Sequence, residues 1–577
     1  MPKLTIDNQQ VDVPPGSTLL DAARQLGIEV PTLCHRRVGD GSIGDASIGD
    51  ASIGGGSCLV CMVRVLPPEA EGPNTDGDAG SAKAAPGRFV PACTAPAEDG
   101  MRVESETDAV HAVRREALEL LLTEHLGDCL APCWFGCPAN MDIPLMLRQI
   151  AAGDFAAAIA TVKRDIALPA VLGHICPAPC ERVCRRGQTD GAVTICLLKR
   201  FVADVDLTQG DPATGKPYLP ECAPDSGKRV AVVGAGASGL SAAYYLQQLG
   251  HQCTIFEQSD QPGGRMLKET TPEQLPREVL RAEIDTLLAT GIELRCGMRV
   301  DETTAASGSD AGVTDSGVTD SGVTAGELRQ PFDAVLYTFG AEGGKGEGGK
   351  GRWTADESTG EFRLKTSTNR TLVIRSAADG KEVATAIDQY LGGRPIAGPE
   401  KPFNTKMGRL DAEELAAFVT VAGDAPRRMP AERSADNTHD EAITGAAESQ
   451  PGYAPEEAIA QADRCLHCDC RALGDCRLRQ WSARYGANPR RHGPSERRFS
   501  WDHSHPDVVY EPGKCIACGL CIEIARRAGE PLGLTFVGRG FEVRVAAPLE
   551  GTMREALQRA AAECVEACPT AALAWRG

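Results

Sequence analysis

The sequence predicts a multidomain protein of mixed α+β and α/β class, and three observations support this prediction. The chain has 577 residues, too many for one hydrophobic core, and at roughly 150 residues per domain it should form about three to five domains. Its 23 cysteines gather in tight groups instead of spreading evenly. A strand, a glycine-rich turn and a helix follow one another near the middle, which is the usual opening of an α/β nucleotide-binding domain.

The composition argues against several classes of protein. The formal net charge is -19, from 60 Lys+Arg against 79 Asp+Glu. This balance argues against a nucleic-acid partner, whose phosphates require a basic face. No apolar run approaches about 20 residues, so we expect no membrane span, and the opening MPKLTIDNQQ shows no signal-peptide pattern. We therefore expect a cytoplasmic protein, in which clustered cysteines are typical of metal ligands.

Composition and cysteine grouping divide the chain into five segments. Low-complexity stretches at 41–57, 312–326 and 343–351 are too poor in large apolar residues to form a core, and we interpret them as insertions without chemistry. The predicted segments are 1–105, a β-grasp domain; 106–225, a helical domain; 226–395, a truncated Rossmann-like domain; 396–455, a linker with short helices; and 456–577, a second cysteine-rich domain.

The first cysteine group lies in the predicted β-grasp domain. Residues 3–13 alternate like a β-hairpin, and residues 18–28 show the pattern of an amphipathic helix. Four thiolates suffice to hold a 2Fe–2S cluster, and glycines before the C-x2-C pair let the backbone approach the sulfurs. A zinc ion or disulfides are the alternative. The predicted ligands are Cys34, Cys58, Cys61 and Cys93.

The motifs TLCHRR, GGGSCLVCMVRV and FVPACTAPAEDGMRV resemble the N-terminal 2Fe–2S domain of the large iron–sulfur subunit of complex I and of its hydrogenase relatives. The resemblance covers residues 3–105. The gaps between Cys34 and Cys58 and between Cys61 and Cys93 are longer than in that family. The added residues are low-complexity sequence, so we expect an intact site.

The second region holds two runs in which cysteine recurs every fourth residue, about one helical turn. A proline shapes the backbone beside each run. The two runs are Cys129, Cys133 and Cys137, followed by Pro138, and Cys176, Cys180 and Cys184, with Pro177.

The segments ALPAVLGHICPAPCERVC and VTICLLKRFVAD resemble the N-terminal iron–sulfur domain of the glutamate synthase small subunit and of dihydropyrimidine dehydrogenase. The resemblance implies two 4Fe–4S clusters next to FAD, and six thiolates are two short of that number. His125, at H-x3-C before Cys129, is similar to a ligand of the complex I cluster held by one histidine and three cysteines; its alternative is a capping histidine. Cys196 is either a further ligand or an ordinary thiol, as we interpret the isolated Cys222, Cys253 and Cys296.

The central region contains a dinucleotide fingerprint in full context. A strand ends at Val233, and the glycines of GAGASG give the tight turn, the approach to a pyrophosphate and the helix–strand packing. An acidic residue ends the next strand, where it can bind a ribose hydroxyl. The predicted binding residues are Gly234, Gly236, Gly239 and Glu257.

The stretch beginning PGGRMLKETTPEQLPREVL, together with FDAVLYTFGA and RSAADGKEVATAIDQYLGG, resembles the FAD domain of the glutamate synthase small subunit. The resemblance adds Gly264 and Arg265 to the FAD site. Two features depart from that family. Only about thirty low-complexity residues separate Gly340 from Arg370, too few for an NAD(P)H domain, and no Gly-Asp flavin segment precedes Thr371. We infer FAD without a separate NAD(P)H site; a scaffold without a cofactor is the alternative.

The C-terminal domain contains two cysteine groups. Cys465, Cys468, Cys470 and Cys476 stand within twelve residues and favour a 4Fe–4S site, with zinc as the alternative.

The second group has the C-x2-C-x2-C spacing with a remote Cys-Pro, which places four thiolates around one 4Fe–4S cluster. Its predicted ligands are Cys515, Cys518, Cys521 and Cys568, with Ala525 at the usual local fourth position and Cys564 as a spare. With LTFVGRGFEVRV between them, these motifs resemble the 4Fe–4S ferredoxin-like domain of the complex I large subunit.

These sites predict an oxidoreductase component, with catalytic residues unknown: an iron–sulfur flavoprotein subunit that relays electrons in a soluble NADH-linked multi-subunit oxidoreductase, with one 2Fe–2S cluster, two to four 4Fe–4S clusters and FAD. The expected partners are an NADH-oxidising FMN flavoprotein and a small 2Fe–2S subunit, with a hydrogenase, a formate dehydrogenase or ferredoxin beyond. The alternatives are a self-contained NAD(P)H-dependent reductase and a non-catalytic iron–sulfur scaffold.

Overall fold

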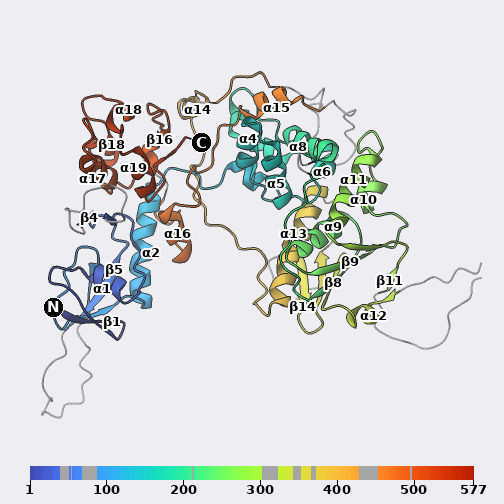
Figure 1. Ribbon diagram of the computed structural model, residues 1–577, viewed down its shortest axis with the longest axis horizontal. Coiled ribbons are helices and arrows are strands. Elements are labelled where there is room, and N and C mark those ends of the chain that lie inside the picture. Colours follow the sequence, from blue (N-terminus) through green and yellow to red (C-terminus); the bar gives the residue numbers. More distant parts are fainter. Residues whose placement is uncertain are drawn as a thin grey trace, which may run out of the picture. The chain divides into compact units, whose positions relative to one another are not determined.

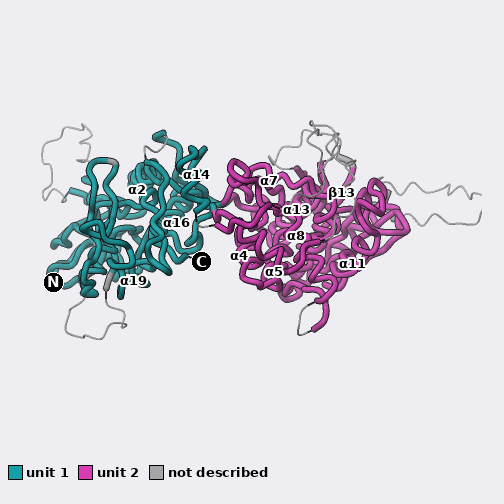
Figure 2. Tube along the Cα trace, turned by 90° about the horizontal axis from the view of Figure 1, so that it is seen from above, with its two compact units in different colours: residues 1–130, 402–420, 468–577 teal, residues 131–401, 421–467 magenta. Residues whose placement is uncertain are grey.

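The computed structural model divides the chain into two compact units, each described by itself (Figure 2). Unit 1 comprises Met1–Leu130, Pro402–Thr420 and Cys468–Gly577, and unit 2 comprises Ala131–Lys401 and Val421–His467. The described residues are 1–38, 51–53, 55–67, 87–210, 214–301, 323–341, 352–365, 372–420, 422–427, 452–493 and 497–576. Most of each low-complexity stretch that we interpret as an insertion lies outside them.

This division differs from the five predicted segments. The boundary expected at 105/106 falls inside unit 1, because the helix after it packs on the N-terminal sheet. The chain leaves unit 1 after Leu130 and re-enters it at Pro402 and again at Cys468. The segment predicted as a linker is therefore divided between the two units. The cysteine runs that begin at Cys129 and at Cys465 are divided in the same way, because the chain changes units within each run.

The N-terminal part of unit 1 has the expected β-grasp architecture. Its sheet has the order β2-β1-β7-β5-β6, in which β1 and β7 pair in parallel and the remaining pairs are antiparallel. The helix α1 (Leu19–Gln25) begins with a capping box, formed by Thr18 and Asp21. The strands are β1 (Lys3–Ile6), β2 (Gln9–Asp12), β5 (Met62–Leu66), β6 (Arg88–Pro91) and β7 (Arg102–Glu104), and β3 (Arg36–Val38) pairs separately with β4 (Ala51–Ile53).

The helix α2 (Asp108–Thr123) joins this sheet to the rest of unit 1. The buried Arg114 on α2 donates from Nε to the Met62 carbonyl, 2.9 Å away, and from Nη1 to the Tyr485 hydroxyl, 2.8 Å away. Tyr485 caps α16 (Arg477–Arg484). These bonds hold the N-terminal sheet and the C-terminal part of the chain in one body.

The C-terminal part of unit 1 contains short helices and two antiparallel strand pairs. The strand pairs are β16 (Val508–Tyr510) with β19 (Leu573–Trp575) and β17 (Thr535–Val537) with β18 (Arg544–Ala546). The helices are α17 (Leu520–Arg527), α18 (Met553–Ala556) and α19 (Ala561–Ala567), and α14 (Ala412–Val419) comes from the segment predicted as a linker.

Unit 2 begins with a helical layer, as predicted. Its core contains Met146, Val162, Leu172 and Leu198, all buried, together with several cysteines. The helices are α3 (Pro132–Gly136), α4 (Ile143–Ala151), α5 (Phe155–Asp165), α6 (Pro169–Ile175), α7 (Pro179–Arg182), α8 (Ile195–Gln209) and α15 (Pro455–Ala462).

The rest of unit 2 is the predicted Rossmann-like domain (Figure 1). Its sheet has the order β10-β9-β8-β13-β15-β14 and is parallel except for β14. From β8 the chain adds β9 and β10 on one side of the sheet, and then β13 on the other side. The strand order therefore reverses at β8, and ligands bind at such a switch point. The elements are β8 (Arg229–Val233), α9 (Ala237–Gln248), β9 (Gln252–Phe256), α10 (Gly264–Lys268), α11 (Arg277–Leu288), β10 (Glu293–Arg295), β13 (Ala334–Ala341), β14 (Trp353–Asp356), β15 (Glu361–Lys365) and α13 (Val373–Leu391), with β11 (Val300–Asp301), β12 (Val323–Thr324) and α12 (Ala325–Arg329) beside them.

The helices α9 and α13 cross at very short range. A Cβ atom at Gly380 of α13 would lie 2.3 Å from the Ser238 carbonyl oxygen of α9. The Ser241 hydroxyl donates to the Ala377 carbonyl, 2.7 Å away, and strengthens the same contact. The close approach of the two helices therefore fixes the N-terminal end of α9, where a glycine-rich turn can position an anionic ligand.

No described helix is both long enough and apolar enough to cross a membrane.

Replacing Gly380 by Val should lower the free energy of unfolding of the chain by about 1–3 kcal/mol, because the added carbons collide with the backbone of α9. The half-buried Glu382 lies two residues further along α13, so Glu382→Val introduces the same residue without that collision and should cost well under about 1 kcal/mol. Chemical unfolding followed by circular dichroism compares the two. Equal losses would contradict the close helix contact.

Candidate metal centres and dinucleotide site

The four cysteines of the N-terminal site converge in unit 1. Their side chains are buried, and the Cys61 and Cys93 sulfurs lie 3.3 Å apart. The Cys34 thiol hydrogen-bonds to those of Cys58 and Cys93, which lowers the pKa of Cys34 to about 2 and raises the pKa of the other two. Four thiols that compete for protons at this range form a donor set suited to iron.

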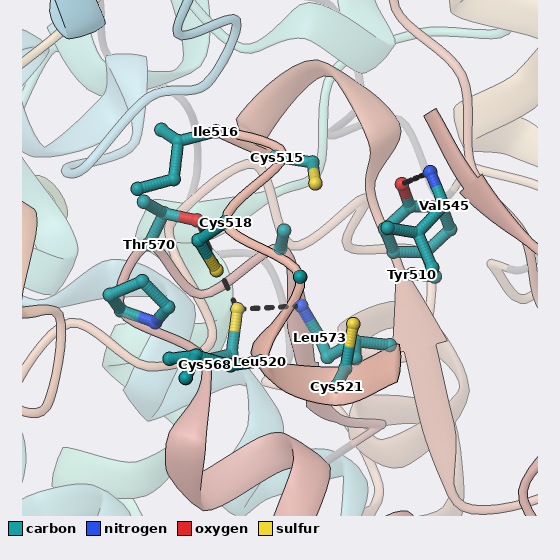
Figure 3. Close-up of a pocket in the computed structure, with 13 residues that line it drawn as sticks. Tyr510, Cys515, Ile516, Cys518, Leu520, Cys521, Val545, Cys568, Thr570 and Leu573 are labelled. Carbon is teal, nitrogen blue, oxygen red and sulfur yellow. Dashed lines mark hydrogen bonds between the residues drawn. The ribbon is translucent and has the colours of Figure 1, made fainter. Parts of the chain in front are cut away.

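The second site of unit 1 surrounds a pocket near the C-terminus (Figure 3). Cys515, Cys518, Cys521 and Cys568 line it, and Figure 3 shows the Cys518 and Cys568 sulfurs directed toward each other. The remaining lining is mainly apolar, and burial raises the pKa of Cys518 to about 12. A thiol in such surroundings becomes a thiolate when a metal supplies positive charge.

Backbone amides point at the sulfurs of this pocket. The Ala517 N–H donates to Cys515 Sγ, and the Leu573 N–H donates to Cys568 Sγ, each at 3.4 Å. Donors of this kind tune the charge on cluster sulfurs. Cys564, four residues before Cys568, instead directs its thiol at the Cys521 carbonyl, 3.5 Å away, and is not part of the lining.

Three cysteine loops share one backbone feature. The second residue after Cys176, Cys465 and Cys515 has a positive φ: 50° at Ala178, 45° at His467 and 52° at Ala517. In each loop the amide of that residue hydrogen-bonds to the sulfur. Alanine and histidine rarely adopt this conformation, so the recurrence indicates that the loops are shaped around their sulfur atoms.

A third set in unit 1 joins Cys129 to distant cysteines, and His125 lies four residues before Cys129. The Cys470 N–H donates to the Cys129 carbonyl, 3.1 Å away, and the thiols of Cys129, Cys470 and Cys476 lie within electrostatic range of one another. Burial lowers the pKa of His125 to about 3, so its imidazole is neutral at physiological pH. Its Nδ1 atom is buried without a hydrogen-bond partner, as expected of a nitrogen reserved for a metal.

A four-cysteine set lies in the helical layer of unit 2. The Cys176 and Cys196 thiols hydrogen-bond to each other, and Cys180 lies within electrostatic range of Cys137 and Cys196. All four are buried. The structure thus selects Cys196, which the sequence leaves open between ligand and ordinary thiol, as the residue that completes this set.

The remaining cysteines of unit 2 are Cys133, Cys184 and Cys465, which pack on the same hydrophobic core. The segment after Cys184 is tied to the segment before Cys465, because Arg186 donates to the Arg464 carbonyl. The segments that carry Cys184 and Cys465 therefore lie side by side, and Cys468 follows Cys465 in the sequence at the C-x2-C spacing.

These groupings correct two expectations from sequence spacing. Cys129 lies in unit 1 whereas Cys133 and Cys137 lie in unit 2, because the chain passes from unit 1 to unit 2 after Leu130. Cys465 is likewise separated from Cys470 and Cys476, because the chain returns to unit 1 after His467. Within the described residues, Cys222 and Cys296 belong to no such set, and Cys253 is buried in the Rossmann-like core.

The dinucleotide motif has the geometry that its residues predict. A Cβ at Gly239 would lie 1.9 Å from the Gly234 carbonyl oxygen, whereas a Cβ at Gly236 would meet open space. Glu257 is buried and accepts from the amides of Ala235 and Ser259, 2.8 and 2.9 Å away. Its carboxylate therefore holds the glycine-rich turn, and a carboxylate retains lone pairs for a ribose hydroxyl.

Gly264 and Arg265, both predicted for the FAD site, differ in their placement relative to the glycine-rich turn. Gly264 approaches the glycine-rich turn, since a Cβ there would lie 2.9 Å from Gly236 Cα. The Arg265 side chain is exposed and forms an ion pair with Glu269 at 2.8 Å. Gly264 is thus placed at the predicted site, while Arg265 is engaged on the surface.

Three family models match separate parts of the chain. They are described as a 2Fe-2S iron–sulfur cluster binding domain, matching residues 2–108; dihydropyrimidine dehydrogenase domain II with a 4Fe-4S cluster, matching 125–211; and an NAD(P)-binding Rossmann-like domain, matching 232–291. The chain is a fusion of these three domains. The fusion confirms the resemblance seen in the sequence and supports both types of cluster.

Two curated relatives are oxidoreductase subunits. The chain is 38% identical over 187 residues to the NADP(+)-dependent formate dehydrogenase subunit beta of Moorella thermoacetica, with 30% of this chain and 26% of the relative covered. It is 34% identical over 223 residues to the NADPH-Fe(3+) oxidoreductase subunit beta of Geobacter sulfurreducens, with 38% and 30% covered. The fusion thus spans less than a third of the length of either relative.

One solved structure, an NAD+-reducing NiFe hydrogenase in the H2-reduced state, is 27% identical over 26% of this chain and 49% of that chain. Its TM-score is 0.15, too low to support a structural argument.

Replacing Cys568 by Ser should remove one 4Fe–4S cluster, about four irons per chain, because this thiol lines the C-terminal pocket. Cys564→Ser is the matched control on the same helical turn and should leave the iron content unchanged. Iron and sulfide analysis of both variants, purified without oxygen, makes the comparison. Loss of iron from the Cys564 variant alone would exchange the roles of the two cysteines.

Proposed function

We propose that this chain is an electron-relay subunit of a cytoplasmic multi-subunit oxidoreductase. Its iron–sulfur clusters change charge by one electron with little rearrangement when bound. The cysteines of the chain would hold these clusters in mainly apolar surroundings, with backbone amides that donate to cysteine sulfurs.

The observation that carries this proposal is a single hydrophobic core in unit 1 to which cysteines of three sets belong. Cys34 and Cys58 of the N-terminal set, Cys476 of the histidine-containing set and Cys518 of the C-terminal set all pack on it. Cys34 and Cys518 lie within electrostatic range of each other. Ligand sets that share one core place their clusters close together, as a relay requires.

The proposed ligand assignment uses every set that the structure gathers. One 2Fe–2S cluster and four 4Fe–4S clusters amount to about eighteen irons per chain. The assigned sets are Cys34, Cys58, Cys61 and Cys93 for 2Fe–2S, and for 4Fe–4S His125, Cys129, Cys470 and Cys476; Cys515, Cys518, Cys521 and Cys568; Cys137, Cys176, Cys180 and Cys196; and the three thiols of Cys133, Cys184 and Cys465.

The Rossmann-like domain is proposed to bind FAD. The N-terminus of α9, the open space at Gly236 and the carboxylate of Glu257 suit a dinucleotide at the switch point between β8 and β13. The chain residues bind and orient the dinucleotide, and FAD supplies the hydride-to-electron conversion when bound.

The proposed donor is an NADH-oxidising FMN flavoprotein that acts through a small 2Fe–2S subunit. The proposed acceptor is a hydrogenase, a formate dehydrogenase or ferredoxin, and the similarity to a formate dehydrogenase subunit supports this choice.

The second candidate function is direct oxidation of NAD(P)H by this chain. The match of residues 232–291 to a domain described as NAD(P)-binding favours it. In that case the nicotinamide dinucleotide would occupy the site that we assign to FAD.

One anaerobic experiment separates the two. The full chain is purified, its iron, sulfide and flavin are measured, and NADH and NADPH are added separately while the visible spectrum is recorded. A relay subunit should contain about eighteen irons and keep its colour with either nucleotide. Rapid bleaching by one nucleotide would overturn the relay in favour of a reductase, and colourless protein after cluster reconstitution would reject both.

Replacing His125 by Ala should abolish one 4Fe–4S signal in electron paramagnetic resonance, because the proposed assignment gives its buried Nδ1 to that cluster. Replacing the exposed His111 on α2 by Ala should change no signal, since its imidazole pairs on the surface with Glu106. An unchanged spectrum in the His125 variant would assign that histidine a structural role.

A further inference from the structure

The helix α8 carries two buried polar residues one turn apart, Cys196 and Lys199. The Cys196 amide donates to the Glu181 carboxylate, 2.9 Å away, which fixes the first turn of the helix. The thiol points at the carbonyls of Leu172 and Gly173, 3.5 and 3.7 Å away, at the end of α6. The side chain of residue 199 follows on the same face of α8, at i+3.

The Lys199 ammonium faces the four-cysteine set of unit 2. It lies within electrostatic range of every member of that set, one turn after Cys196 on α8, and its side chain is buried. The set consists of Cys137, Cys176, Cys180 and Cys196.

The other titratable groups near Lys199 form no direct ion pair with it. Glu283 lies within electrostatic range, but its two oxygens accept from the amides of Ala170 and Val171, 2.5 and 2.7 Å away. Burial lowers the pKa of His174 to about 4, so this imidazole is neutral at physiological pH. No carboxylate among the described residues forms an ion pair with Lys199.

A second buried lysine in the same unit shows the contrast. Lys163 on α5 pairs with Asp206 at 2.5 Å, so its charge is balanced by protein alone. Burying an ammonium without a counter-charge is costly. The thiols of the four-cysteine set are the groups left to balance Lys199, and as metal-bound thiolates they would carry the negative charge that it needs.

We propose that Lys199 is the built-in counter-charge of the cluster held by Cys137, Cys176, Cys180 and Cys196, and that it raises the reduction potential of this cluster. The proposal rests on the proposed function for the ligand set. Reduction adds one electron and no proton, so the negative charge of the site grows. A fixed cation at short range in a low-dielectric core stabilises the reduced form more than the oxidised one.

A purely structural role makes a different prediction. If Lys199 only filled space, a methionine of similar length would preserve packing and leave the potential unchanged. Buried charges are often replaced by apolar residues without loss of stability, so the potential is the readout that separates the two roles.

The test uses redox titration of the full chain, purified anaerobically and followed by electron paramagnetic resonance. Cys196→Ser first identifies the signal of this cluster as the one that is lost or altered. Lys199→Met should keep the wild-type iron content and make reduction of that cluster at least tenfold less favourable, about 59 mV lower for a one-electron couple. Lys199→Arg keeps the positive charge, so its reduction potential should stay close to the wild-type value.

Arg200→Gln is the matched control, since this neighbouring cation on α8 is already paired with Asp204, and it should leave the potential unchanged. An unchanged potential in an iron-replete Lys199→Met protein would overturn the proposal. If that variant loses iron, Lys199→Gln carries the same comparison with a polar side chain. If the Cys196→Ser variant instead keeps all signals of the wild-type protein, the ligand assignment is rejected, and with it the role of Lys199.

Discussion

Both units depend on the electrostatics of buried sulfur. A neutral thiol is easily accommodated in an apolar core, whereas a thiolate is costly there unless positive charge lies beside it. The structure gathers thiols at distances where they perturb one another, as the opposite pKa shifts of Cys34 and Cys93 show. Groups of buried thiolates of this kind are stable only when a metal ion replaces the thiol protons. Cluster binding and folding should therefore be closely coupled in this chain.

The positions of these thiols explain how a second unit is accommodated within the sequence of the first. Cys129 and Cys470, far apart in sequence, are joined by a backbone hydrogen bond of 3.1 Å. The ends of the intervening segment are thus held together by unit 1 itself. An insertion whose ends are close disturbs its host little, and here the host site shares its ligands between both sides of the insertion.

The same reasoning links the sheet of unit 2 to its helical layer. Glu283 on α11, buried and bound to two amides at the start of α6, has its pKa raised to about 7 by burial. This contact fixes α6, which ends at Cys176, against the Rossmann-like domain. The dinucleotide site and one four-cysteine set are therefore positioned by one continuous framework, which suits electron exchange between them.

The sequence by itself determined the local features of this protein. The glycine-rich turn after Val233, the hairpin at 3–13 and the C-x2-C-x2-C run at Cys515 depend on neighbours in sequence, and the structure and the family comparisons agree with them. Turn and spacing rules act over a few residues, so these features could be predicted.

Only the tertiary structure decided which thiols belong together. Spacing assigns Cys465 to Cys476, but the chain changes units between them, and no local rule records such a crossing. The H-x3-C motif at His125 and the C-x5-C spacing of Cys470 and Cys476 were visible separately; their union depends on packing between remote segments. The charge at Lys199 was hidden for the same reason, because burial and the absence of a paired carboxylate among the described residues are properties of the folded core.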